Sequence, residues 1–251
     1  MSPGGKYVAK DLYEVGGVPI VIKSLLDGGY INGDCITVTG KSIGENHRDV
    51  IFPKDQDVVY TCDKPISEHS SVVGLWGNLA EDGSISKIAG LKNLKFKGKA
   101  KCFDCEEDAL TAVLKNEIKA GDAVIIRYEG PKGGPGMREM LGPTSAIMGK
   151  GLGDKVAFLT DGRFSGGTHG FVVGHISPEA YEGGPLALVR DGDSINIDAS
   201  SNQINIADSE KEMKERKESW ESPKKNQETG VLGKYRSLVT SASQGAVTTK
   251  N

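Results

Sequence analysis

One acid and one hydroxyl stand in two glycine-rich turns of the segment 130–180. The acid is Glu139, which follows the small residues 133–136, where the backbone can approach a ligand closely and expose N–H groups. The hydroxyl is Ser165, within the run GRFSGG at 162–167. A strand that delivers a small nucleophile or base into a glycine turn is a recurring active-site layout. In most such turns, however, glycine is present only because the backbone takes a positive φ there. This segment is therefore a candidate catalytic site.

The elements around these turns must place the acid and the hydroxyl. An apolar run at 156–160 has the length and composition of a buried strand, and a second strand at 171–175 follows the serine turn. A further strand is predicted at 123–128, ahead of the glycine run. Pro143 opens a short helix that continues through Met148. The pattern predicts that strands and strand ends hold both turns.

The rest of the chain indicates mixed α/β order. Helices are predicted at 18–27 and 106–119, and the charged segment 211–225 is typical of a solvated helix. Ser177 and Pro178 have the pattern of an N-cap and a first helical residue. Further short strands are predicted at 36–39, 58–61, 72–76 and 84–88, and in a hairpin at 194–198 and 203–206. Many short strands with few helices predict an α/β fold with a barrel-like β core and flanking helices.

Composition narrows the function classes. The chain has 251 residues, of which 37% are hydrophobic and 26% charged, which suits one large domain or one domain with an appendage. A formal net charge of −3 gives no basic surface for nucleic acid. No apolar run reaches the ~18 residues of a membrane span, and the first residues lack the pattern of a secretory signal. We expect a soluble protein with no nucleic-acid or membrane partner.

The four cysteines favour structural roles. Cys102 and Cys105 form a CxxC pattern, but Cys35 and Cys62 stand alone, so a second pair with zinc-ribbon spacing is missing. No thioredoxin-like βαβ unit surrounds the pair. If Cys105 caps the helix that is predicted to follow it, the pKa of its thiol should be lowered.

The chain resembles the C-terminal domain of the dihydroxy-acid dehydratase family, which shares its fold with sugar-acid and phosphogluconate dehydratases. The resemblance covers nearly every residue from Gly5 onward. The matching motifs are DLYEVGGVPIV at 11–21, GDCITVTGK at 33–41, VGLWGN at 73–78, GRFSGGTHGFVVGHISPEA at 162–180 and GVLGKYRSLVTSASQGA at 230–246. The serine-turn motif is similar to the dihydroxy-acid branch in particular. The resemblance implies a swivelling β/β/α domain.

The resemblance also implies a domain organisation. Residues 1–34 would be an inter-domain lead-in with a helix, and 35–251 the C-terminal domain. The family's large N-terminal domain carries the iron-sulfur cluster cysteines, two magnesium-binding aspartates and a carbamylated lysine. We expect that cluster-binding domain to be absent from this chain. The implied activity is a hydro-lyase reaction that converts 2,3-dihydroxy-3-methyl acids to 2-keto acids in valine and isoleucine biosynthesis, with Mg²⁺ and an iron-sulfur cluster as cofactors.

Site roles follow from the same resemblance. Glu139 matches a magnesium ligand of the family, and magnesium prefers one or two carboxylates plus waters and substrate oxygens. Ser165 is the candidate base. Its hydroxyl is too weak an acid to ionise unaided, so it requires a nearby cation. The candidate substrate-binding residues are Arg163, Gly166 and Gly167. Arg163 could instead be a structural hydrogen-bond donor. His169 is a candidate for orienting a ligand.

One departure bears on the site. Many family members have proline where this chain has Arg138. A guanidinium there could disturb the proposed cation site, or it could point to solvent.

Two hypotheses from different classes remain open. The chain could be a dehydratase component, for a dihydroxy acid or a sugar acid, that is inactive until an N-terminal domain or a full-length relative joins it. It could instead be a non-catalytic remnant or binding module of the same fold. Either way we expect homo-oligomers through an exposed apolar face. The resemblance implies a cytoplasmic location, or an organelle in a eukaryote.

Overall fold

The computed structural model describes residues 5–67, 70–165, 168, 170–224 and 229–249. The chain divides into two compact units, Met1–Ser70 and Ser71–Asn251. The first unit holds α1 (Ala9–Glu14), α2 (Gly17–Asp27) and α3 (Ile43–His47), so the helix predicted at 18–27 is confirmed. Among the described residues of this unit, only Ile20 and Ser24 are buried, both on α2. The unit therefore has almost no hydrophobic core of its own.

Two predicted strands in the first unit are wrong, because side chains satisfy the backbone locally. Residues 36–39 form a turn with an isolated bridge from Ile36 to Ser42, and the Thr37 hydroxyl donates to the Lys41 carbonyl at 2.9 Å. Residues 58–61 form no strand. The Gln56 side-chain oxygen accepts the N–H groups of residues 58 and 59 at 2.9 and 2.8 Å. Such local bonds compete with a strand ladder.

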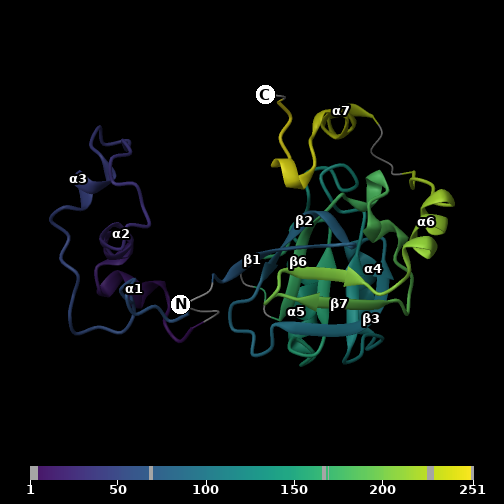
Figure 1. Cartoon of the computed structure of the whole chain (residues 1–251), viewed down its shortest axis with the longest axis horizontal. Coiled ribbons are helices and arrows are strands. Elements are labelled where there is room, and N and C mark those ends of the chain that lie inside the picture. The colour runs from purple at the N-terminus through teal and green to yellow at the C-terminus, as the bar shows by residue number, and fades with distance from the viewer. Residues whose placement is uncertain (1–4, 68–69, 166–167, 169, 225–228, 250–251) are drawn as a thin grey trace. The chain divides into compact units, whose positions relative to one another are not determined.

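The second unit is built on a closed β-barrel. Its strands follow the order β1-β2-β6-β5-β4-β3-β7-β8 around the barrel, and Figure 1 shows this unit. The strands are β1 (Val72–Gly77), β2 (Ala80–Lys87), β3 (Lys95–Phe103), β4 (Asp122–Ile126), β5 (Ala157–Thr160), β6 (Phe171–Ser177), β7 (Ser194–Asp198) and β8 (Gln203–Ile206). The neighbours β3, β4, β5 and β6 run parallel, whereas β1–β2, β2–β6, β3–β7 and β7–β8 are antiparallel. The predicted barrel-like core is confirmed.

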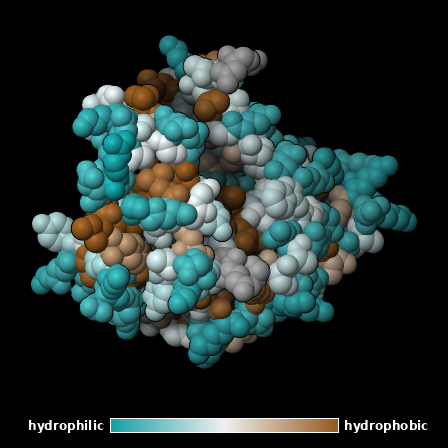
Figure 2. All heavy atoms as spheres, turned by 60° about the vertical axis from the view of Figure 1, so that its left-hand side comes forward, coloured by the Kyte–Doolittle hydropathy of each residue, from teal (hydrophilic) through white to brown (hydrophobic). Residues whose placement is uncertain are grey.

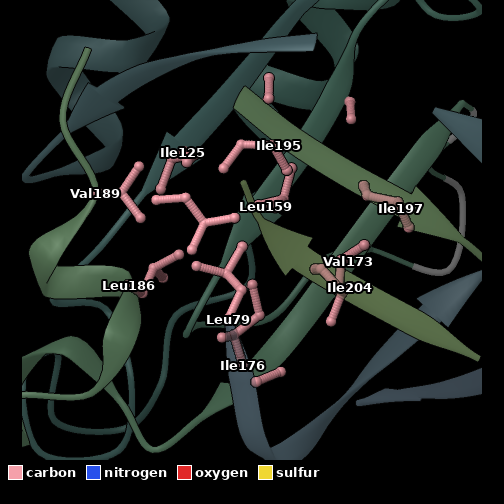
Figure 3. Close-up of a cluster of buried hydrophobic side chains, with 14 of the residues drawn as sticks. Leu79, Ile125, Leu159, Val173, Ile176, Leu186, Val189, Ile195, Ile197 and Ile204 are labelled. Carbon is pink, nitrogen blue, oxygen red and sulfur yellow. The ribbon is translucent and has the colours of Figure 1, made fainter. Parts of the chain in front are cut away.

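The central parallel strands are buried on both faces. In β4, Ala123 and Ile125 face the barrel interior, whereas Val124 and Ile126 belong to a second apolar cluster that includes residues of α4 and α5. Burial on both faces explains why this strand is a continuous apolar run. Figure 3 shows side chains of the interior cluster, among them Leu159, pointing toward one another from several strands. This core fixes the strand ends from which the candidate site extends.

The helices of the second unit are α4 (Glu106–Leu114), α5 (Leu141–Gly149), α6 (Glu210–Glu218) and α7 (Gly230–Leu238), with 3₁₀ turns at Ala180–Glu182, Pro185–Leu188 and Ala242–Gln244. The helix predicted at 106–119 ends early, because Asn116 takes the left-handed conformation with φ 60°. The helix predicted to begin at Pro178 is only a 3₁₀ turn that starts at Ala180. None of the described helices has the length and apolar character needed to cross a membrane.

Candidate active site

The glycine run after β4 wraps closely around its own preceding backbone. A Cβ on Gly133 would lie 2.8 Å from the Tyr128 carbonyl oxygen, and one on Gly134 would lie 2.9 Å from the Glu129 Cα. Neither contact is tolerable, so both positions need glycine. The run then turns through Gly136, which has φ +94°. The glycine run therefore packs closely against this chain's own backbone, and its approach to a ligand stays a prediction.

Glu139 and the serine turn are joined through their backbones. Glu139 and Arg163 form an isolated parallel bridge. The Arg163 N–H donates to the Arg138 carbonyl at 3.2 Å, and the Met140 N–H donates to the Arg163 carbonyl at 2.9 Å. Ser165 lies two residues beyond the bridge and is half-buried. The fold thus brings together the two segments that the sequence singled out.

The Glu139 side chain is free to take a ligand. The residue is exposed, and no described residue forms a hydrogen bond or an ion pair with its carboxylate. No set of three His, Cys, Asp or Glu within the described ranges could hold a metal ion. The carboxylate therefore suits one position in a magnesium shell, and a complete shell would need ligands from elsewhere.

The serine turn is anchored on both sides of Ser165. Phe164 lies against β6, where a Cβ on Gly174 would meet its ring at 2.7 Å. The Ser165 carbonyl accepts the Thr168 N–H at 3.1 Å. Three residues with predicted roles lie outside the described residues. They are Gly166 and Gly167, predicted to bind substrate, and His169, predicted to orient a ligand.

The Arg163 guanidinium has a structural contact. Its Nε donates to the Met137 carbonyl at 2.5 Å, which adds a third link between the glycine-run loop and the serine turn. Its charge also helps to lower the pKa of His175, although desolvation of the half-buried imidazole is the larger cause. A role in substrate binding stays a prediction.

Arg138 points to a cluster of acids. Its guanidinium bonds both carboxylate oxygens of Glu107, at 2.8 and 3.2 Å. It also lies 3.1 Å from Glu106 Oε2 and 3.4 Å from Glu129 Oε1. The hydrogen bond from Arg138 lowers the pKa of Glu107 to about 2. The positive charge of Arg138 is therefore neutralised by residues of α4 and by the buried Glu129.

Two buried carboxylates that sequence reasoning missed lie under the site. Asp161 follows β5, and Glu179 follows β6. Burial raises the pKa of Asp161 to about 6 and that of Glu179 to about 7. Asp161 directly precedes the serine-turn motif at 162–180 and Glu179 lies within it, but an acid within a Gly/Pro-rich turn gives no sign that it will be buried. Their position at neighbouring strand ends could be found only from the topology.

The two cysteines of the CxxC pattern, Cys102 and Cys105, are not activated thiols. The expectation for Cys105 is wrong: although this residue is the N-cap of α4, burial and neighbouring acids raise the pKa of its thiol. The acids include Asp108 and Glu107 in the first turn, and they offset the helix dipole. Burial also raises the pKa of Cys102 to about 12. None of the four cysteines forms a disulfide bond.

Family models match both parts of the chain. The model described as dihydroxy-acid/6-phosphogluconate dehydratase C-terminal covers residues 57–246, and the corresponding N-terminal model covers residues 1–46.

Curated relatives match along nearly the whole chain. A dihydroxy-acid dehydratase of Methylococcus capsulatus is 55% identical over 249 residues, which is 99% of this chain and 44% of that protein. Dihydroxy-acid dehydratase 2 of Bradyrhizobium diazoefficiens is 54% identical over 99% of this chain and 43% of its own length. Dihydroxy-acid dehydratase 2 of Pseudoalteromonas translucida is 54% identical over 100% of this chain and 45% of its own length. The chain thus spans less than half the length of these relatives.

Proposed function

Because the chain belongs to the dihydroxy-acid/6-phosphogluconate dehydratase family, we propose that it is the C-terminal part of a hydro-lyase for 2,3-dihydroxy-3-methyl acids. The products would be the 2-keto acids that lead to valine and isoleucine. The observation that carries the proposal is the backbone bridge between Glu139 and Arg163, which places the loop of one candidate beside the turn of the other. The names of the matched relatives support the dihydroxy-acid substrate.

In the proposed reaction Ser165 takes the proton from C2 of the substrate. The electron pair of the C2–H bond forms the C2=C3 double bond, and the 3-hydroxyl leaves as hydroxide. The proton that Ser165 took up would convert this hydroxide to water and return Ser165 to its ionised form. The resulting enol then loses the proton of its 2-hydroxyl and takes up one at C3, which gives the 2-keto acid. Atoms and electrons balance without an external oxidant, so this chain need supply only the base and the groups that hold the substrate.

The base requires help from charge. A serine hydroxyl is a very weak acid, so the ionised form of Ser165 needs a cation close by. Mg²⁺, when bound, supplies that charge and also stabilises the negative charge that develops on the substrate. Glu139 would hold it as one carboxylate ligand, which fits its exposed and unengaged side chain. The iron-sulfur cluster would be held by ligands outside this chain.

Substrate contacts would come from the serine turn. We assign Arg163, Gly166 and Gly167 to substrate binding, and His169 to orienting a bound group. Arg163 already holds the Met137 carbonyl through Nε. Its remaining guanidinium nitrogens are the groups that would receive a substrate carboxylate.

The expected partner is the N-terminal part of such a dehydratase. The first unit buries only Ile20 and Ser24 among its described residues, yet the N-terminal family model matches its residues 1–46. Figure 2 shows exposed hydrophobic groups among hydrophilic ones. Large apolar side chains exposed among the described residues of this unit are Val8, Tyr13, Val18, Tyr30, Ile36, Val38, Ile51, Tyr60 and Ile66. We propose that this unit packs against the rest of the N-terminal domain, that the assembly forms homo-oligomers, and that it works in the cytoplasm or in an organelle.

Turnover tests the proposal. The chain would be assayed anaerobically with Mg²⁺ for conversion of 2,3-dihydroxyisovalerate to 2-ketoisovalerate, alone and with the separately produced, cluster-loaded N-terminal part of the Methylococcus capsulatus relative. Activity is expected only in the mixture. A parallel assay with 6-phosphogluconate would reveal a sugar-acid dehydratase component. Failure with both substrates, in a mixture whose two parts bind each other, would favour a non-catalytic binding module.

A further inference from the structure

Asp161 ties three neighbouring strand ends together. The residue lies one position beyond β5, begins the serine turn, and is fully buried. Its Oδ1 accepts the Glu129 N–H at 3.0 Å, and its Oδ2 accepts the N–H groups of Tyr128 and Ala180 at 3.1 and 2.9 Å. The first two donors follow β4 and the third follows β6. One carboxylate therefore fixes the backbone on both sides of the turn that leads to Ser165.

Glu179 holds the glycine-run loop in the same way. Its Oε1 accepts the Lys132 N–H at 2.9 Å, and its Oε2 accepts the Gly133 N–H at 2.8 Å. A Cβ on Gly130 would lie 2.6 Å from Oε2, so the loop closes tightly around this carboxylate. The next residue along the chain, Ala180, donates to Asp161. The two carboxylates are thus connected through adjacent residues.

A buried carboxylate is costly unless several donors satisfy it. Here backbone N–H groups fill that requirement. Four of these donors lie in the irregular segment that follows β4, and the fifth, the Ala180 N–H, lies at the start of a 3₁₀ turn. An apolar side chain could fill the same space, but it could not hold these N–H groups at fixed positions. The arrangement therefore specifies where the loop runs.

Building on the function proposed above, we propose that Asp161 and Glu179 are positioning residues, which together set the loop that carries Glu139 against the turn that carries Ser165. Asp161 fixes the base of the turn, and Glu179 fixes the base of the loop. The backbone bridge of Glu139 with Arg163 then closes the frame. Neither carboxylate need touch the substrate.

The chain offers a matched control for Glu179. Glu182 also contacts Lys132, but through the Lys132 ammonium group, and its side chain is 39% exposed. Replacing Glu182 by Gln removes a negative charge close to Glu179 without removing any bond to the loop backbone. The Glu179→Gln variant keeps the size of the side chain but replaces one acceptor oxygen by an NH₂ donor, which must face an N–H group.

Amide hydrogen exchange on the full 251-residue chain tests the proposal. We expect Glu179→Gln to speed exchange at Lys132 and Gly133 by about tenfold or more, and also at Met140, whose N–H donates across the bridge to Arg163. Core amides such as that of Leu159 should keep their protection, which separates local loosening from global unfolding. Glu182→Gln should change none of these rates by more than about twofold.

Unchanged exchange at Met140 in a folded Glu179→Gln variant would overturn the proposal, because the loop would then keep its place without the carboxylate. Asp161→Asn provides a second test at the base of the turn, with faster exchange expected at Tyr128 and Glu129. In an active mixture with the N-terminal part, Glu179→Gln should lower kcat about tenfold and leave KM within about twofold. A wild-type mixture without turnover would contradict the proposed function, while exchange at Met140 would still decide this inference.

Discussion

The backbones of Glu139 and Arg163 pair side by side as a single parallel bridge. The bridge is short, but it joins the loop after β4 to the turn after β5, and the Arg163 side chain reinforces it by donating to the Met137 carbonyl. It places the one unengaged carboxylate of the site on a strand-like segment next to the segment that leads to Ser165. Because backbone pairing defines this arrangement, changes to the Glu139 side chain should leave it intact.

Replacement of Glu139 by Gln should therefore affect the cation requirement and not the fold. The residue is exposed and no described residue pairs with its carboxylate, so the free energy of unfolding should change by less than about 0.5 kcal/mol. In the reconstituted mixture the Mg²⁺ concentration for half-maximal rate should rise about tenfold or more. The exposed Glu117→Gln variant is the control. An unchanged Mg²⁺ requirement would remove Glu139 from the cation site.

Replacement of Arg138 by Ala should have a small effect on stability. Its side chain is 45% exposed and that of its closest partner, Glu107, is 67% exposed, so solvent screens the pair. We expect a loss below about 1 kcal/mol in urea unfolding, which shrinks further at high salt. A double-mutant cycle with Glu107→Gln would isolate the pair. If Arg138→Ala shifted the Mg²⁺ requirement strongly, the guanidinium would act on the cation site rather than on the acids of α4.

Replacement of Gly170 by Ala should destabilise the end of the serine turn. The residue has φ +87°, and a Cβ there would overlap the Gly153 carbonyl oxygen. We expect a loss of more than about 2 kcal/mol in the free energy of unfolding. Gly149, at the end of α5, has open space where a Cβ would stand and no positive φ, so Gly149→Ala should be neutral or stabilising by up to about 1 kcal/mol. Equal effects from the two variants would contradict the described turn.

Stability should fall as pH rises through the window set by the two buried carboxylates. The folded pKa of Asp161 is raised to about 6 from 3.8, and that of Glu179 to about 7 from 4.5, mainly by burial. At a pH between the unfolded and the folded pKa values, the folded state binds more protons than the unfolded state. The stabilising contribution of these two carboxyl groups is therefore complete below about pH 4 and lost by about pH 7. Urea unfolding from about pH 4.5 to about pH 7.5 measures this. Asp161→Asn should flatten the lower part of the curve, whereas a curve that Asp161→Asn and Glu179→Gln both leave unchanged would argue against raised pKa values.

The sequence predicted most of the buried strands because their pattern is strong. The runs that became β4, β5 and β6 are apolar on both faces, and such continuous runs are hard to mistake. β3 was not predicted, because it has no β-branched residue and is rich in lysine. Its alternation of lysine with small or apolar residues is nevertheless the period-2 pattern of a half-buried strand, and its pairing with β4 and β7 agrees with that pattern.

The site was predictable in part. Glu139 and Ser165 stand out because their turns are rich in glycine, and the fold brings the two segments together. Asp161 and Glu179 do not stand out, because a carboxylate becomes buried through the long-range meeting of strand ends, which local sequence does not encode. The direction of the Arg138 side chain depends in the same way on Glu107 of α4, which is distant in the sequence.

Turnover by the Ser165→Ala variant tests the central claim most directly. The variant and the wild-type chain would each be mixed with the N-terminal part of the relative, and formation of 2-ketoisovalerate would be measured under identical anaerobic conditions. Ser237→Ala, on the exposed surface of α7, is the control. If Ser165 is the base, its loss should reduce kcat by about 10²-fold or more while the control keeps its rate. A Ser165→Ala mixture that turns over at the wild-type rate would contradict the assignment of Ser165 as the base.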